Sequence, residues 1–117
     1  MTQEDKELLL KDLCARLQYG VKISVNDKIE SLQGINVLDN VVEYGSFLSS
    51  DIEEVKPYLF PLSSMTEEQR FEYNNNYAES FDWLNAQHFD WLNAHHFDYR
   101  GLIEKGLAIE APEGMYN

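Results

Sequence analysis

Residues 21–48, VKISVNDKIESLQGINVLDNVVEYGSFL, decide the fold class that we expect for this chain. VKISV (21–25) alternates apolar and polar side chains with a period of two, which is typical of a half-buried strand. Further strands are expected at about 28–38 and 41–48, because both segments carry β-branched and aromatic residues and a DN turn signal separates them. Gly34 predicts a bulge or a sharp bend. The stretch therefore predicts a small, strongly curved antiparallel sheet. The same strands are also compatible with an SH3-like barrel.

A helix is expected before the sheet, over about residues 3–17. Its apolar residues form one stripe at helical spacing: Leu9, Leu10, Leu13, Cys14 and Leu17. Leu13 lies at the centre of this stripe, so we expect it to be fully buried against the sheet. We expect the Cys14 thiol to be buried and inert. The polar residues of the segment, Asp12 among them, lie elsewhere on the helix.

The segment that follows the expected hairpins, SSDIEEVKPYLFPLSS (49–64), is punctuated by prolines. It predicts a short helical turn capped by Ser50 or Asp51, and then an extended piece that closes the sheet.

The remaining part of the chain is expected to be helical. Ser64 or Thr66 can cap a helix over about 66–86, and Asp98 can cap a last short helix, YRGLIEKGLA, that stops near Gly106. The inward side of the longer helix is expected to include Phe71, Tyr77 or Ala78, Phe81 and Leu84. The predicted fold class is therefore α+β, with an N-terminal helix on a small antiparallel sheet and a helical C-terminal third.

The length and composition predict a single domain, residues 1–117, in which 1–64 form the helix and sheet and 65–117 a helical extension. Apolar residues make up 44% of the chain and aromatic residues 13%, which is enough to bury a core despite a formal net charge of −12. The acidic surface disfavours nucleic acid and anionic lipid as direct partners. The single cysteine, the acidic N-terminus and the lack of a long apolar segment predict a cytoplasmic protein without a membrane span.

An octapeptide occurs twice in the C-terminal half, as FDWLNAQH (81–88) and FDWLNAHH (89–96). Eight residues of helix turn through two turns plus about 80°, so the two copies would face different ways on one helix. Two copies are also fewer than a repeat architecture needs. We therefore expect a tolerated duplication, in which Trp91 is buried and Trp83 is the looser of the two.

Three segments carry a resemblance to a known family: KELLLKDLCARL, DIEEVKPYLFPLSSMTEEQ and WLNAHHFDYRGLIEKGLAIEAPEGMYN. They resemble a family of short uncharacterised proteins encoded by gut bacteria of the Bacteroides group and by their phages and mobile elements. The resemblance implies a biological context but no activity. The chain departs from the family at Gln18, where relatives tend to have proline, and in carrying the WLNAxH block twice. The second departure agrees with a recent in-frame duplication.

Catalytic, metal and cofactor sites are not expected. His88, His95 and His96 lie near three aspartates in the sequence, but a helical metal site pairs its ligands at i and i+4, which these histidines do not. The serine pairs at 49–50 and 63–64 fall at turns or caps without a nucleophile motif. An enzyme would need a pocket with convergent polar groups, and the sequence does not call for one.

The leading functional hypothesis is a small, non-enzymatic protein-interaction module of a phage or mobile element that binds a host or phage protein. Its expected surface is aromatic and consists of Trp83, Phe89, Trp91, Phe97 and Tyr99. The rival interpretation is that at least half of these aromatics belong to the core. Two further hypotheses are an acidic nucleic-acid mimic that inhibits a DNA-binding host protein, with carboxylates in a duplex-like stripe, and a structural or homo-oligomerising protein without a separate ligand.

Overall fold

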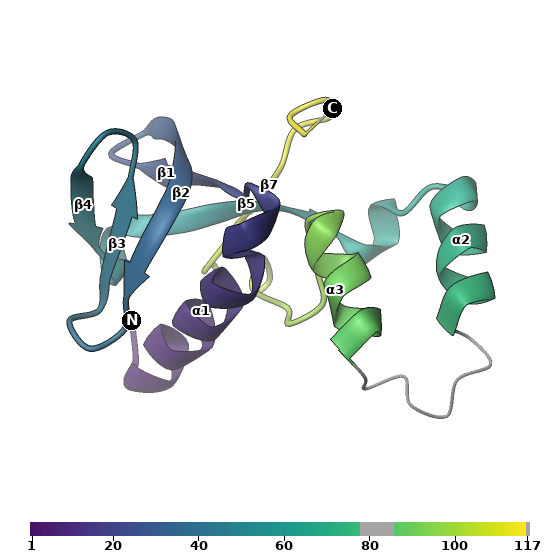
Figure 1. Ribbon diagram of the computed structural model, residues 1–117, viewed down its shortest axis with the longest axis horizontal. Coiled ribbons are helices and arrows are strands. Elements are labelled where there is room, and N and C mark those ends of the chain that lie inside the picture. The colour runs from purple at the N-terminus through teal and green to yellow at the C-terminus, as the bar shows by residue number, and fades with distance from the viewer. Residues whose placement is uncertain (78–85, 117) are drawn as a thin grey trace.

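The computed structural model describes residues 1–77 and 86–116, and it has an α+β architecture (Figure 1). Helix α1 (Gln3–Arg16) begins at a capping box, in which the backbone N–H of Asp5 donates to Oγ1 of Thr2 over 3.0 Å. A 3-10 turn, η1 (Leu17–Tyr19), and Gly20 with a φ of 71° end this helix. The expected N-terminal helix is confirmed.

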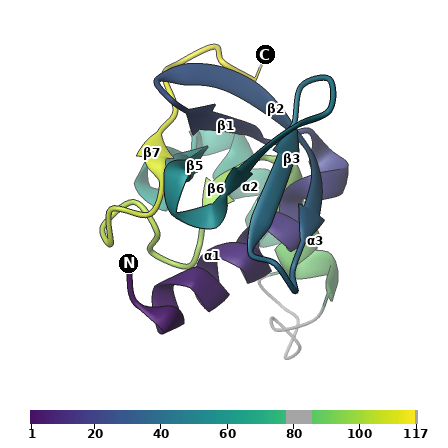
Figure 2. The ribbon, with the colours of Figure 1, turned by 90° about the vertical axis from the view of Figure 1, so that its left-hand side faces the viewer.

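Strands β1 to β4 form an antiparallel meander and β5 pairs with β1, which gives the order β4-β3-β2-β1-β5. The five strands curl around a core with α1 running beneath them (Figure 2). Their bounds are β1 (Lys22–Val25), β2 (Lys28–Asn36), β3 (Val41–Tyr44), β4 (Leu48–Asp51) and β5 (Val55–Pro61). The turn between β1 and β2 has positive φ at both Asn26 and Asp27, as a tight hairpin requires. The register of β2 against β3 shifts between Leu32 and Gly34, which confirms the expected bend.

The short helical turn predicted before β5 is η2 (Ile52–Glu54). Asp51 caps it, because its Oδ1 accepts from the backbone N–H of Glu53 over 3.0 Å. Strand β5 then pairs with β1 and closes the meander, as expected.

The C-terminal third differs from the expected helical extension. It contains α2 (Glu67–Tyr77), α3 (Ala86–Ala94) and two short strands, β6 (Phe97–Asp98) and β7 (Ile109–Glu110). Both short strands pair in parallel with β5, so the sheet is mixed rather than wholly antiparallel. Parallel pairing arises here because the chain crosses over through helices and loops before it returns to the edge of β5.

Turns replace the helix that the sequence predicts after Asp98. The Asp98 carboxylate does cap this segment, since it accepts from the backbone N–H groups of Leu102 (3.0 Å) and Ile103 (2.9 Å). Gly101 and Gly106 both have positive φ, 75° and 74°, and these conformations interrupt helical geometry on either side of a single turn. The position of the cap was therefore predicted correctly, but the predicted helix after it was wrong.

Two clusters of buried apolar residues lie under the sheet and beside it. The larger joins α1 to the meander, and Leu13 within it is fully buried, as predicted. The smaller is built on Trp91, Leu92 and Phe97. Phe71 was expected to face inward but is 70% exposed, because α2 instead turns Tyr73 toward Trp91, with ring centroids 5.4 Å apart. The other expected inward positions of this helix lie outside the residues whose side chains the structure describes.

Helix α1 buries a different stripe from the predicted one. Asp12 is fully buried and Cys14 is exposed, which is the reverse of the expectation. The buried positions Leu9, Asp12, Leu13 and Arg16 follow the i, i+3, i+4, i+7 spacing of one helix face. The charges of Asp12 and Arg16 compensate each other inside the protein, so this stripe is not visible as an apolar pattern. In the described parts of the chain, no helix is both long and apolar enough to cross a bilayer.

Candidate functional site

A cleft of about 470 Å³ lies between the end of β5, the start of α2 and the C-terminal segment 109–116, which we call the strap. Phe60 and Phe97 form its aromatic floor, and their ring centroids are 6.2 Å apart. Among the described residues, the charged side chains that line it are Glu110 and Glu113 of the strap. We call this hollow the strap cleft.

The wall opposite the strap is built by the capped start of α2. The N–H of Gln69 donates to Oγ1 of Thr66 over 3.1 Å, and the N–H of Thr66 donates to Oε1 of Gln69 over 2.9 Å. This reciprocal pair is a capping box, and it makes Thr66 the cap of α2, one of the two residues that the sequence offered for this role. Next to it, the Ser64 hydroxyl donates to the carbonyl of Pro61 over 2.7 Å. The polar groups of this wall are therefore fixed by local hydrogen bonds.

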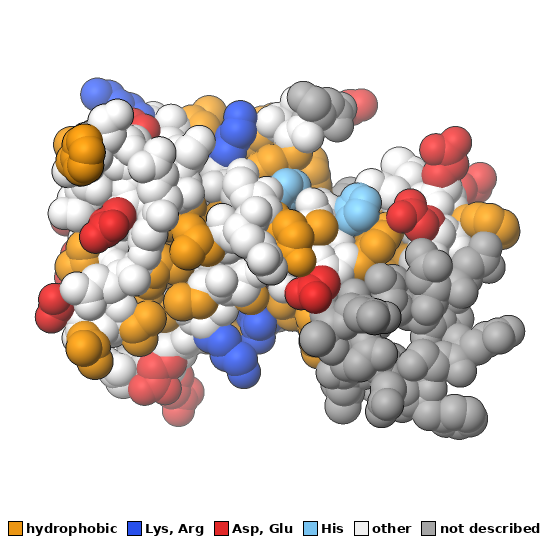
Figure 3. Space-filling view, viewed as in Figure 1, with side chains coloured by type: hydrophobic (Ala, Val, Ile, Leu, Met, Phe, Trp, Pro, Cys, Tyr) orange, Lys and Arg blue, Asp and Glu red, His pale blue; other side chains and the backbone are white. Residues whose placement is uncertain are grey.

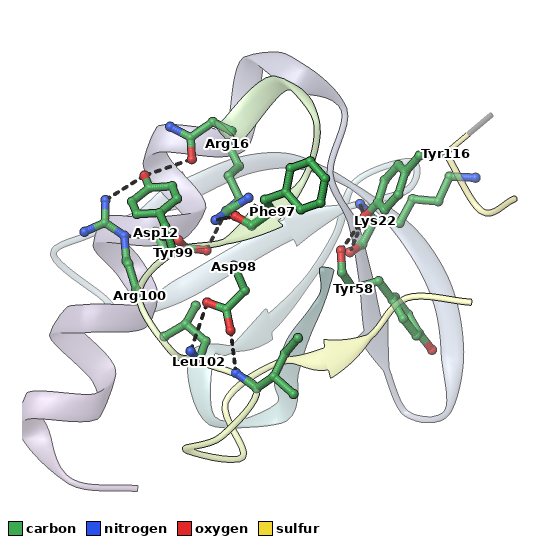
Figure 4. A network of polar contacts seen from close by, with 12 residues as sticks. Asp12, Arg16, Lys22, Tyr58, Phe97, Asp98, Tyr99, Arg100, Leu102 and Tyr116 are labelled. Carbon is green, nitrogen blue, oxygen red and sulfur yellow. Dashed lines mark hydrogen bonds and ion pairs between the residues drawn. The ribbon is translucent and has the colours of Figure 1, made fainter. Parts of the chain in front are cut away.

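The strap is fixed at both of its ends. Near its start, β7 pairs with β5, and the N–H of Ala111 donates to the Leu59 carbonyl over 2.7 Å. Near its end, the Tyr116 hydroxyl donates to the Tyr58 carbonyl over 2.6 Å and accepts from the N–H of Lys22 over 2.9 Å (Figure 4). The chain between these two anchors carries Glu113, so both anchors position the acidic wall.

His96 supports the Tyr116 anchor from the other side. The two rings stack with centroids 3.6 Å apart and an interplanar angle of 15°. Burial, assisted by the positive charge of Arg16, lowers the pKa of His96 to about 4, and burial raises the pKa of Tyr116 to about 12. Both side chains are therefore neutral at pH 7, and the stack adds no charge behind the cleft.

A buried charge network lies behind the cleft floor (Figure 4). Oδ2 of Asp12 is 2.8 Å from Nε of Arg16, and Oδ1 of the same carboxylate is 3.1 Å from Nε of Arg100. Arg16 also donates through Nη2 to the backbone carbonyl of Phe97 over 2.6 Å, and Arg100 donates to the Tyr99 hydroxyl over 3.1 Å. The network thus ties α1 to the floor residue Phe97.

Two side-chain nitrogens in this region are buried without a hydrogen-bond partner among the described residues, Nη1 of Arg16 and Nδ1 of His96. A buried polar atom without a partner costs free energy. The network carries two arginines against one aspartate, so its formal charge is +1. This arrangement fixes Phe97 and β6 in place at some cost in stability.

The aromatic residues that the sequence assigned to an interaction surface lie mainly inside the protein. Phe97 is 1% exposed and Trp91 8%, and Phe89 and Tyr99 are half-buried against them. Nε1 of Trp91 donates to Glu72 over 3.1 Å. Trp83 lies outside the described residues. Of the expected set, Phe97 therefore reaches the candidate site, as its floor.

The histidines do not form a metal site in the described part of the chain. His95 stacks on Trp91 with centroids 4.1 Å apart, and the His96 ring packs against Tyr116. The side chain of His88 lies outside the described residues. No group of three or more histidine, cysteine, aspartate or glutamate residues among those described has the arrangement to hold a metal ion.

Sequence reasoning missed the residues that shape the site. Glu110 and Glu113 stand in a chain of 21 acidic residues, where no pattern separates them from the others. The i, i+4 spacing of Asp12 and Arg16 was the available signal for the network, because opposite charges at that spacing meet on one helix face. No local pattern in the sequence marks Tyr116 as an anchor.

Comparisons with known proteins found no matching family model, no matching curated protein and no matching solved structure. The resemblance to short proteins of the Bacteroides group therefore stays a prediction. The function has to be argued from the geometry of this chain.

Proposed function

We propose that this protein is a small, non-enzymatic protein-interaction module, and that the strap cleft receives a basic, extended segment of its protein partner. The observation that carries the proposal is the composition of the cleft. Both charged side chains in its lining, Glu110 and Glu113, are acidic, and its floor is aromatic. A lysine or arginine side chain satisfies both features, because its aliphatic stem packs on Phe60 while its cationic head reaches the carboxylates.

The charge of the whole chain supports the same class of partner. A formal net charge of −12 attracts basic surfaces over distances longer than direct contact, and it speeds their encounter. The two fixed ends of the strap also favour binding, since a cleft that is already formed requires little ordering when a ligand arrives.

The arrangement of acidic side chains favours an interaction module over a nucleic-acid mimic. On the face drawn in Figure 3, the carboxylates lie in separate groups over different elements. A mimic of duplex DNA needs them in a continuous stripe, because phosphates repeat regularly along each strand. The biological setting of the proposal, an accessory protein of a phage or mobile element that acts on a host or phage protein, comes from the sequence resemblance.

The proposal is tested by affinity capture from lysates of the host bacterium, with and without the phage, followed by quantitative mass spectrometry. The native chain is compared with the double variant Glu110→Gln and Glu113→Gln. A matched control, Glu54→Gln with Glu104→Gln, removes the same charge from two exposed positions that do not line the cleft. We expect a basic partner to be captured equally by the native and control chains, and about three- to tenfold less by the cleft variant.

Equal loss of the partner with both double variants would assign the effect to net charge and contradict a role for the cleft. A captured partner whose recovery is the same with all three chains would place the binding surface elsewhere. Circular dichroism of each variant ensures that the comparison is made between folded proteins.

A further inference from the structure

A second hollow lies between the outer face of α1 and the turn that joins β2 to β3. It has a volume of about 220 Å³, and Leu10, Cys14 and Val37 provide its apolar surface. Glu7 and Lys11 line it as well. In Figure 3, apolar side chains show where this turn meets α1, with charged side chains close by. None of these residues belongs to the strap cleft.

The turn that lines this hollow also carries a protruding apolar residue. Leu38 follows the lining residue Val37, and it is 95% exposed, while Val37 is 55% exposed. An isolated exposed leucine needs no explanation, but here a protrusion and a hollow are neighbours on one surface. In a two-fold symmetric dimer, each protrusion can lie over the hollow of the other copy, which is how a self-complementary interface closes.

The two charged residues at the hollow can also pair with their counterparts in a second copy. Glu7 and Lys11 are one helical turn apart and have opposite signs. Two α1 helices related by a two-fold axis perpendicular to them run antiparallel, so Glu7 of one copy can face Lys11 of the other in both halves of the contact. Cys14 is exposed as a residue, but partial desolvation of its thiol in this hollow raises the pKa above its ordinary value, so the thiol stays uncharged at neutral pH and adds no repulsion.

We infer that this face binds a second copy of the chain, with Leu38 of each copy seated in the α1 hollow of the other. The contact is small, and each copy has a net charge of −12, so the dimer is expected to be weak. We expect a dissociation constant on the order of 100 µM at an ionic strength of about 0.15 M, where repulsion beyond about 8 Å is screened. This inference does not depend on the function of the strap cleft.

The test is sedimentation equilibrium of the full chain, from about 5 to about 500 µM, which brackets the expected dissociation constant. Leu38→Asp is expected to weaken self-association at least tenfold, because it would place a carboxylate in an apolar hollow. Phe47→Asp is the matched control, since Phe47 is also fully exposed on a hairpin turn and the substitution adds the same charge. Both positions are on the surface, so both variants should fold.

A charge-exchange experiment tests the two-fold arrangement itself. Glu7→Lys and Lys11→Glu each put like charges opposite each other in a homodimer, so each variant alone should associate at least tenfold more weakly than the native chain. A mixture of the two variants restores opposite charges across the interface, and it should associate as the native chain does. If the two substitutions acted only within their own helix, mixing the two variants would not restore self-association.

The single cysteine supplies a second readout. Alkylation of Cys14 by iodoacetamide should slow as the concentration of the native chain rises, and it should be independent of concentration in Leu38→Asp. A native chain that is monomeric over the whole range would overturn the inference and leave the hollow to a different partner. Equal weakening by Leu38→Asp and Phe47→Asp, or a mixture that fails to recover, would overturn it as well.

Discussion

Removing the Asp12 carboxylate is the perturbation that the buried network makes most informative. Asp12 and Arg16 are both fully buried, and the carboxylate is 2.8 Å from Nε of Arg16 and 3.1 Å from Nε of Arg100. Asp12→Asn keeps the size of the side chain but leaves Arg16 as a buried cation without a counter-charge. Breaking a buried ion pair on one side costs about 3 to 5 kcal/mol, which is a large part of the roughly 5 to 15 kcal/mol that stabilises a domain of this size.

The measurement is urea unfolding followed by tryptophan fluorescence, since Trp91 is buried in the native chain. The double variant Asp12→Leu with Arg16→Met removes both fully buried charges. It should be more stable than Asp12→Asn, because the one arginine that it leaves without a counter-charge, Arg100, is partly exposed to water. Glu7→Gln, on the exposed side of the same helix, is the control, with an expected change within about 0.5 kcal/mol. A loss below about 1 kcal/mol for Asp12→Asn at an unchanged m-value would refute the reasoning.

Four further outcomes are expected. Leu13→Ala should lower the free energy of unfolding by about 2 to 5 kcal/mol, because Leu13 is fully buried; an unchanged melting temperature would contradict its packing. Tyr116→Phe should lower it by about 1 to 3 kcal/mol, since an N–H and a carbonyl lose their shared partner, and hydrogen exchange should speed up in the strap. Folding lowers the pKa of His96 from 6.5 to about 4. Between pH 4 and pH 6.5, the His96 imidazole is therefore protonated in the unfolded chain but neutral in the folded chain. Stability should therefore fall as the pH drops from 6.5 to 4 and stay level above it, and His96→Asn should flatten this slope in a pH series of urea unfolding curves. Deleting residues 81–88 should leave a folded protein with the fluorescence of a buried Trp91, and an unfolded product would show that the duplication is required.

The sheet was predictable because its signals are local. The period-two alternation at 22–25 and the bend at Gly34 each depend on neighbouring residues, and each is present in the structure. Leu13 was also predictable, because it lies on any apolar stripe drawn through α1. Local patterns of this kind determine strands, turns and caps.

The candidate site was not predictable, because it depends on contacts between distant parts of the sequence. Arg16 reaches the Phe97 carbonyl across 81 positions, and the Tyr116 hydroxyl reaches Lys22 across 94. The sequence around Asp12 is typical of a surface position. Its burial becomes understandable only in the folded chain, where Arg16 and Arg100 compensate its charge. Pairing between distant segments also produced the parallel strands β6 and β7, for which two residues each are too few to give a periodic signal.

The most direct test of the proposed function is a titration of the isotope-labelled chain with a synthetic extended peptide of alternating lysine and threonine, followed by NMR. A peptide with glutamine in place of lysine is the control. We expect saturable amide shifts centred on residues 60–69 and 109–116, which line the strap cleft, and we expect the Glu110→Gln and Glu113→Gln double variant to bind the peptide about three- to tenfold more weakly. Shifts spread over all acidic surfaces, or an unchanged dissociation constant in that variant, would contradict the assignment of the cleft as the binding site.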